Sequence, residues 1–188
     1  MKIENIKVLK NKIRKKILKL RELNFNDSKK INLNKVKEII TNYKKKSLIL
    51  GGYYPINYEI DCISILENLE KKRHKISLPV IKKNNQMDFH TYSFGDPLKL
   101  NKYGIPEPLS KEIVFPDILF VPLVAFDGKL FRLGYGGGYY DRYIEKIDKK
   151  KFFLKIGFAF NCQKISRVPV DVFDKSLDIV ITENKVYE

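Results

Sequence analysis

The feature that most constrains the fold is a passage from a buried strand through clustered glycines into a helix. The apolar run Ile118–Phe126 is continuous, which is typical of a central strand with both faces covered. Gly134 and Gly136–Gly138 follow it, and a short helix is predicted over Tyr140–Ile147. Glycines let a backbone approach an anion closely, and a helix N-terminus directs free N–H groups at the same point. The segment therefore predicts a phosphate-binding loop at the carboxyl end of a central strand.

Helical and strand patterns alternate along the chain. Apolar residues spaced by three and four predict helices over Ile3–Leu20 and over Glu59–Arg73. Between them a helix is predicted to follow Asp27 and Ser28, which are N-cap types, and to run through Ile40 until the lysine run Lys44–Lys46. Further strands are predicted at Ser47–Tyr54, Ile76–Ile81, Met87–Phe94, Leu154–Phe160 and Leu177–Thr182. The sequence contains no internal repeat and no linker. We therefore predict one α/β domain over residues 1–188, a layered fold with a largely parallel central sheet flanked by helices, on which a basic N-terminal helix (2–22) packs.

Composition narrows the functional classes. The net charge is +15, from 37 basic and 22 acidic residues, so the surface attracts polyanions. Most of the basic charge is lysine spread along the chain, which favours a solvated surface over a nucleic-acid site. Two distant cysteines and two isolated histidines suggest neither a zinc site nor a Ser/His/Asp hydrolase. No apolar run approaches the ~20 residues of a membrane span, and we expect a cytoplasmic protein.

The residues flanking the glycines point to a nucleoside triphosphate. A P-loop would need a lysine and a hydroxyl here, and the dinucleotide fingerprint would need glycine in place of Tyr139. Instead Arg132 precedes the glycines and Asp141 follows them. An arginine can hold a phosphate with two hydrogen bonds, and a carboxylate beside a triphosphate is a usual protein contribution to a Mg²⁺ site. The alternative is a glycine-rich turn with no ligand.

A second cluster lies at Gly51–Asp61, where tyrosines surround Glu59 at the start of a predicted helix. Aromatic rings with one carboxylate suit a flat, amine-bearing heterocycle, because the rings cover its faces while the carboxylate accepts from its N–H donors. The local pattern fits equally well a strand whose tyrosines end in the core and whose carboxylates favour a helix N-terminus.

Four motifs together resemble the 5-formyltetrahydrofolate cyclo-ligase family, whose members are also called methenyltetrahydrofolate synthetases. They are R-L-G-Y-G-G-G-Y-Y-D-R at Arg132–Arg142, E-I-D at Glu59–Asp61, G-I-P-E-P at Gly104–Pro108 and V-P-V-D-V-F-D-x-x-x-D at Val168–Asp178. The resemblance implies an ATP- and Mg²⁺-dependent conversion of 5-formyltetrahydrofolate to 5,10-methenyltetrahydrofolate, with release of ADP and phosphate. We expect a monomer that binds this small molecule and neither nucleic acid nor membrane.

The resemblance also assigns roles to single residues. It implies catalytic roles for Arg132, Tyr139 and Asp141, and makes Asp141 and Asp178 the Mg²⁺ ligands. The implied ATP site comprises Lys10, Arg14, Arg132, Leu133, Gly134, Tyr135, Gly136, Gly137, Gly138, Tyr139 and Tyr140. The implied folate site comprises Tyr54, Glu59, Tyr135, Gly136, Gly137, Gly138 and Tyr139. The chain departs from the family pattern at Phe173, where members often have histidine, and at Gly137, where some have lysine.

Two other functions compete with this prediction. The basic N-terminal helix would serve a nucleic-acid-binding module, which has no use for the glycine segment. A phosphosugar- or coenzyme-A-handling enzyme on a similar fold would use the glycine loop but would not require paired Asp141 and Asp178.

Overall fold

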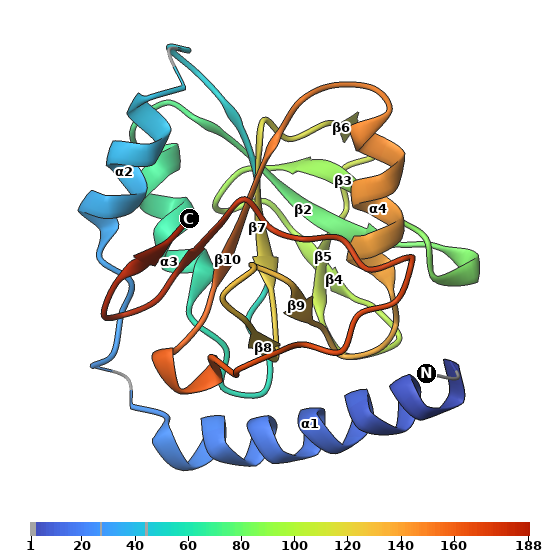
Figure 1. Ribbon diagram of the computed structural model, residues 1–188. Helices are drawn as coiled ribbons and strands as arrows, with labels where there is room; N and C mark the ends of the chain where they lie inside the picture. The colour runs from blue at the N-terminus through green and yellow to red at the C-terminus, as the bar shows by residue number, and fades with distance from the viewer. Residues whose placement is uncertain (1–2, 27, 44) are drawn as a thin grey trace.

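The computed structural model describes residues 3–26, 28–43 and 45–188, with the backbone alone at residues 3 and 4. Its centre is an eight-stranded sheet in the order β12-β11-β10-β7-β1-β2-β3-β6 (Figure 1). The strands are β1 (Ile49–Gly51), β2 (Lys75–Ile81), β3 (Met87–Tyr92), β6 (Ile113–Val114), β7 (Ile118–Pro122), β10 (Leu154–Phe158), β11 (Ile179–Ile181) and β12 (Val186–Tyr187). The four pairs from β2 to β11 are parallel, and the outer pairs are antiparallel. The predicted fold class is confirmed.

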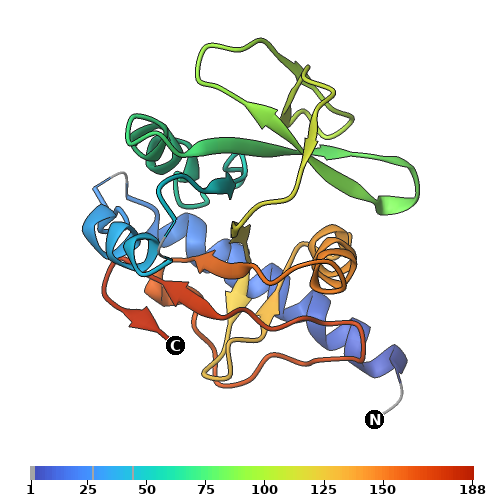
Figure 2. The ribbon, with the colours of Figure 1, turned by 90° about the horizontal axis from the view of Figure 1, so that it is seen from above.

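Helices cover both faces of the sheet. The helices α2 (Leu33–Thr41) and α3 (Cys62–Glu70) lie on one side, and α4 (Tyr139–Asp148) lies on the other (Figures 1 and 2). Alternate residues of β7 point to opposite sides. Ile118 and Phe120 belong to the core cluster under α2 and α3, whereas Leu119 and Val121 belong to the cluster under α4. Because both faces of β7 are covered, its sequence is continuously apolar.

Two helices begin later than predicted. Asn32 caps α2, accepting a hydrogen bond from the backbone N–H of Asn34 at 2.9 Å. The predicted cap at Asp27 lies outside the described residues. Asp61 caps α3 in the same way, accepting from the N–H of Ser64 at 3.1 Å. A side chain that accepts these free N–H groups fixes the first turn better than apolar spacing does.

The predicted strand Ile118–Phe126 is wrong in its second half. β7 ends at Pro122, and β8 (Ala125–Phe126) leaves the main sheet to pair with β9 (Arg132–Leu133). Proline has no N–H with which to continue a ladder of hydrogen bonds. The resulting hairpin carries the chain from the carboxyl edge of the sheet to the glycine loop, Gly134–Gly138. The predicted loop from Gly95 to Pro116 also contains a hairpin, formed by β4 (Leu98–Leu100) and β5 (Pro106–Pro108), as well as β6.

The first helix, α1 (Ile3–Asn24), lies across the end of the sheet to which β7 points (Figure 1). Its apolar stripe is buried only in part: Ile17 is buried and Ile13 packs against the same core cluster, whereas Leu9 is 40% exposed. Lys10 and Arg21 are buried as well. These two cations are eleven residues apart, about three whole turns, so they lie on one face of the helix. The amphipathic pattern thus predicts the helix correctly, but cations make up much of the face that packs on the protein. None of the described helices is long and apolar enough to cross a membrane.

Candidate active site

The glycine loop joins β9 to α4 at the carboxyl edge of the sheet. Gly136 has a φ of 102° and Gly138 a φ of 66°, a left-handed region that glycine enters without steric cost. Gly138 is also the N-cap of α4, so the loop leads directly into the N–H groups of the first helical turn. A Cβ atom added at Gly136 would lie 3.3 Å from Cζ of Arg14. The bare backbone therefore leaves room for a guanidinium at the loop.

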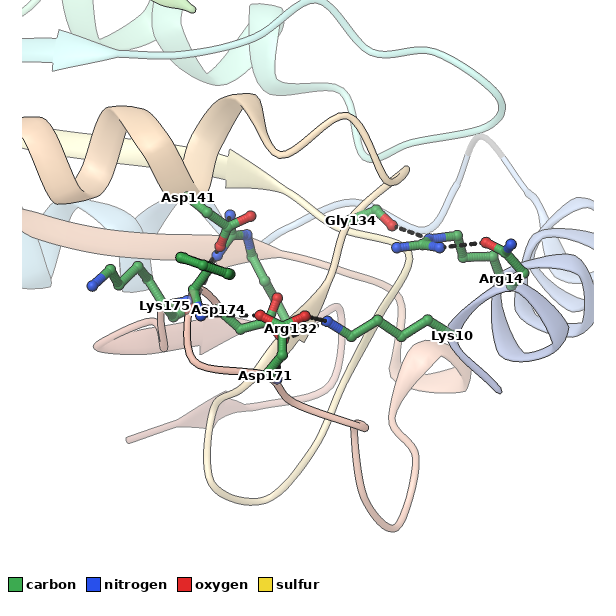
Figure 3. Close-up of polar contacts among 10 residues, drawn as sticks. Lys10, Arg14, Arg132, Gly134, Asp141, Asp171, Asp174 and Lys175 are labelled. Carbon is green, nitrogen blue, oxygen red and sulfur yellow. Dashed lines mark hydrogen bonds and ion pairs between the residues drawn. The ribbon is translucent and has the colours of Figure 1, made fainter. Parts of the chain in front are cut away.

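Arg14 of α1 brings a positive charge to this loop (Figure 3). Its Nε donates to the carbonyl of Gly134 at 2.7 Å, and its Nη1 donates to Oδ1 of Asn11 at 2.6 Å. Among the described residues no carboxylate lies within ion-pair distance of it. Burial lowers the pKa of Arg14 while the nearby Asp174 raises it, and an arginine remains charged at neutral pH. Arg14 thus offers a cation with no carboxylate in direct contact, beside glycine backbone.

Lys10, one turn earlier on α1, is held by two carboxylates. Its Nζ lies 2.7 Å from Oδ2 of Asp171 and 2.5 Å from Oδ2 of Asp174 (Figure 3). Burial alone would lower the pKa of Lys10, but the bonds to Asp171 and Asp174 outweigh burial and raise it. Lys10 therefore stays protonated and ties α1 to the segment before β11.

Arg132 and Asp141 form the third group. Nη2 of Arg132 lies 3.1 Å from Oδ1 of Asp141, and its Nη1 donates to the carbonyl of Lys175 at 2.8 Å (Figure 3). The backbone N–H of Lys175 donates to the same Asp141 oxygen at 3.2 Å. The Arg132 side chain is 3% exposed, whereas that of Asp141 is 25% exposed. Asp141 is thus fixed on one side and accessible on the other.

Glu59 lies in a buried polar position next to the loop. Its Oε2 accepts from the N–H of Ile56, and its Oε1 accepts from the hydroxyl of Tyr135, both at 2.9 Å. Burial raises the pKa of Glu59 to about 7, although both hydrogen bonds and the charge of Arg21 act to lower it. The structure therefore joins the predicted folate-binding carboxylate to the predicted phosphate loop through Tyr135.

The remaining predicted binding residues differ in how far they are buried. The Tyr139 hydroxyl lies 3.2 Å from that of Tyr103, which belongs to the β4–β5 hairpin. Tyr54 and Tyr140 are half-buried against the two core clusters. Leu133 is a correction, because its side chain is buried in a third core cluster and its carbonyl accepts from the N–H of Val124. An apolar residue of a hairpin strand here packs its side chain inward, so that side chain is directed away from the glycine loop.

Asp178 is a second correction, because it is not placed with Asp141. It directly precedes β11, and its Oδ2 accepts from the N–H of Lys155 at the start of the parallel strand β10, at 2.7 Å. Nζ of Lys155 lies 3.4 Å from Asp178 and 3.9 Å from Asp148, the last residue of α4. Asp141 is in the first turn of the same helix, about 10 Å away along the axis. Asp178 thus lies near the amino edge of the sheet, and the predicted pair of metal ligands does not form.

Asp141 alone suits a metal that arrives with a nucleotide. Within residues 3–26, 28–43 and 45–188, no group of three or more His, Cys, Asp or Glu side chains gathers for a metal. Mg²⁺ is commonly held by one or two carboxylates together with substrate phosphates and water. One accessible, oriented carboxylate beside the predicted phosphate loop fits that pattern.

Four residues of the site were missed by sequence reasoning: Arg21, Asp171, Asp174 and Lys175. The two aspartates belong to the V-P-V-D-V-F-D motif quoted above, so the signal was present, but nothing in a sequence shows which cation they would meet. Arg21 lies eleven residues after Lys10 and seven after Arg14, and spacing of this kind places all three on one helical face. That stripe of cations was the available signal.

The comparisons with known proteins agree with this geometry. A model of the 5-formyltetrahydrofolate cyclo-ligase family matches residues 6–183. The chain is 36% identical over 137 residues to the 5-formyltetrahydrofolate cyclo-ligase of Haemophilus influenzae, covering 69% of this chain and 73% of the relative. It is 32% identical to that of Mycoplasma genitalium, covering 92% and 96%. The NMR structure of Aquifex aeolicus 5,10-methenyltetrahydrofolate synthetase aligns with a TM-score of 0.73 and 32% identity, covering 96% of this chain and 92% of that one. The family model matches nearly the whole chain, and the residues of its motifs meet at one edge of the sheet. The protein therefore belongs to the 5-formyltetrahydrofolate cyclo-ligase family.

Proposed function

We propose that this protein converts 5-formyltetrahydrofolate to 5,10-methenyltetrahydrofolate at the expense of ATP. The observation that carries the proposal is the Arg14 guanidinium, which lies against the glycine loop with no carboxylate partner among the described residues. A half-buried cation without a counter-ion favours an anionic ligand. The loop backbone and the start of α4 present N–H groups at the same place. These features suit the phosphates of a nucleotide.

The position of Glu59 supports the folate half of the proposal. Its carboxylate is buried, and each oxygen already accepts one hydrogen bond from the protein. A carboxylate oxygen can accept more than one such bond. The remaining lone pairs suit the N–H donors of a pterin, whose ring would lie against the aromatic side chains nearby. Glu59 thereby provides orientation, while the glycine loop provides the phosphoryl donor.

The chemistry requires positioning more than a protein nucleophile. The formyl oxygen on N5 attacks the γ-phosphorus of ATP, ADP leaves, and an iminium phosphate remains. N10 attacks the formyl carbon, the carbon–oxygen bond breaks, phosphate departs, and the proton on N10 is lost. Charge on the transferred phosphoryl group must be neutralised. Arg14 and Arg132 are the cations available for this, and Lys10 joins them where phosphate oxygens compete with Asp171 and Asp174 for its ammonium group.

We further propose that Asp141 would hold the Mg²⁺ that accompanies ATP. The bound metal would supply charge neutralisation at the phosphates. Arg132 and the N–H of Lys175 fix one oxygen of Asp141, which leaves the other oxygen for the metal. The Tyr139 hydroxyl, which shares a hydrogen bond with the hydroxyl of Tyr103, would help to position the substrate.

The direct test mixes the purified protein with 5-formyltetrahydrofolate, ATP and Mg²⁺ and follows the near-ultraviolet absorbance of the conjugated methenyl product. We expect a rise that requires ATP and that is strongly reduced in Asp141→Asn. A matched control is Asp148→Asn at the opposite end of the same helix, which should leave the rate unchanged. If the folded protein binds ATP but produces no methenyl product, the nucleotide site stands and the folate assignment is wrong.

A further inference from the structure

Arg21 occupies a position that a surface cation would not. Its side chain is among the most buried in the protein, at 1% exposure, and it reaches from α1 to the end of β7. Nη1 donates to the carbonyl of Leu123 at 3.2 Å, and Nη2 donates to the hydroxyl of Tyr135 at 2.5 Å. Its Nε has no hydrogen-bond partner among the described residues. A buried guanidinium is costly unless an opposite charge compensates it, so this placement calls for an explanation.

The opposite charge lies one hydroxyl away. The Tyr135 hydroxyl accepts from Arg21 and donates to Oε1 of Glu59 at 2.9 Å. Because Arg21 can only donate, the direction of the hydroxyl proton is fixed toward the carboxylate. The guanidinium carbon also lies 5.8 Å from the centre of the Tyr135 ring. Arg21, Tyr135 and Glu59 therefore form a relay from α1 through the glycine loop to the folate-binding region.

Arg21 is also the charged neighbour of Glu59. The other titratable groups that interact with the charge of Glu59 come from three different segments of the chain, and burial raises the pKa of each above its ordinary value, so all are neutral near pH 7. They are Tyr53, Cys62, Tyr135 and Tyr140. Among these groups Arg21 alone favours the ionised form of Glu59 by its charge, and Tyr135 favours it by its hydrogen bond.

We propose that Arg21 is a positioning residue which, through the hydroxyl of Tyr135, holds Glu59 as an oriented carboxylate for the folate. This inference rests on the proposed function. Its consequence is that the N-terminal helix sets the folate site as well as the phosphate loop. Tyr135 then has two separate duties, since its backbone belongs to the phosphate loop and its hydroxyl serves the folate side.

The test uses Tyr135→Phe, which removes only the hydroxyl and keeps the loop backbone. The matched control is Tyr187→Phe, which removes a hydroxyl that donates to Asn161 at 2.9 Å near the C-terminus. We expect the Kd for 5-formyltetrahydrofolate, measured by calorimetry, to rise about tenfold to a hundredfold in Tyr135→Phe. The KM for ATP should stay within about twofold, because no backbone group is lost. The control should match wild type in both values.

The pH profile separates positioning from a structural role. In the wild type, folate binding should weaken as pH falls through the pKa of Glu59, about 7. In Tyr135→Phe and in Arg21→Met the weakening should begin at higher pH, because each change removes a group that lowers that pKa. The double variant should lose less folate-binding free energy than the sum of the two single losses, since Arg21 and Tyr135 act in part through one relay. A merely structural contact would leave the pH profile unshifted.

The outcomes are distinct. Folate affinity within twofold of wild type in Tyr135→Phe, with an unshifted profile, overturns the relay, and this holds even where Arg21→Met does not fold. Normal folate binding by wild type without turnover counts against the proposed function alone. No folate binding by wild type overturns both. Weakened folate affinity, unchanged ATP KM and a shifted profile support the relay.

Discussion

Replacing Glu59 by glutamine should change how stability depends on pH. Folding buries this carboxyl and raises its pKa from 4.5 to about 7. Each tenfold change in a proton equilibrium corresponds to about 1.4 kcal/mol, so the shift is worth about 3 kcal/mol. Because the folded state binds the proton more tightly, this contribution is fully present below pH 4.5 and is lost as pH rises through 7. Relative to Glu59→Gln, wild type should therefore lose about 3 kcal/mol of unfolding free energy over that range.

The measurement is urea unfolding of both proteins from about pH 4 to about pH 8, without ligands. Glutamine also disturbs the bonds to Ile56 and Tyr135, but that loss does not depend on pH and drops out of the slope. Glu145→Gln, an exposed position on α4, is the control and should parallel wild type. If the curve for Glu59→Gln also parallels wild type, Glu59 is not desolvated in the folded state and the reasoning fails.

Three further changes test other parts of the structure. Arg132→Lys keeps the charge but cannot contact both Asp141 and the Lys175 carbonyl, so kcat/KM should fall about tenfold to a hundredfold; a rate within threefold of wild type would contradict its role. Asp178→Asn should lower the unfolding free energy by about 1 kcal/mol and leave the Mg²⁺ requirement unchanged. Asp141→Asn, in contrast, should raise the Mg²⁺ concentration that gives the half-maximal rate. If both variants raise that concentration equally, the hypothesis of paired metal ligands is restored. Gly157→Ala places a Cβ 2.6 Å from two leucine methyl groups and should lower the free energy of unfolding in urea by about 1–3 kcal/mol. An unchanged free energy of unfolding would mean that the core relaxes freely around the new methyl group.

Much of the fold could be predicted because periodicity reports burial. The continuous apolar run of β7 and the alternation in β3 led to strands in the right places. The errors lie where a single residue overrides the pattern. Pro122 ends β7 inside an apolar run. Asp61 caps α3, so the helix begins at Cys62, three residues after the predicted start at Glu59. The hairpin of β4 and β5 was missed because each strand has only three residues, too few to show a period, and because β5 reads Pro-Glu-Pro, a pattern typical of a loop.

The candidate site could be predicted only in part, for a different reason. Motif spacing reveals local chemistry, and Lys10, Arg14 and the glycine loop do lie together at one edge of the sheet. Which partner a charge meets depends on contacts between distant segments, such as Lys10 with Asp174, 164 residues apart. The same limit explains Asp178, whose place at the amino edge follows from the parallel pairing of β10 with β11.

The position of α1 has a consequence for synthesis in the cell. Its residues leave the ribosome well before their partners at Leu123, Gly134 and Asp171, which follow them in the chain by 102, 120 and 161 residues. While the nascent chain grows, α1 has only about six turns of its own backbone to stabilise it, and its buried cations have no acceptors. Acquisition of the helix must therefore be a late step of folding. A chain that stops before Pro169 keeps the glycine loop but lacks Asp171 and Asp174, the carboxylates that anchor Lys10, so incomplete translation products should not acquire the proposed nucleotide site.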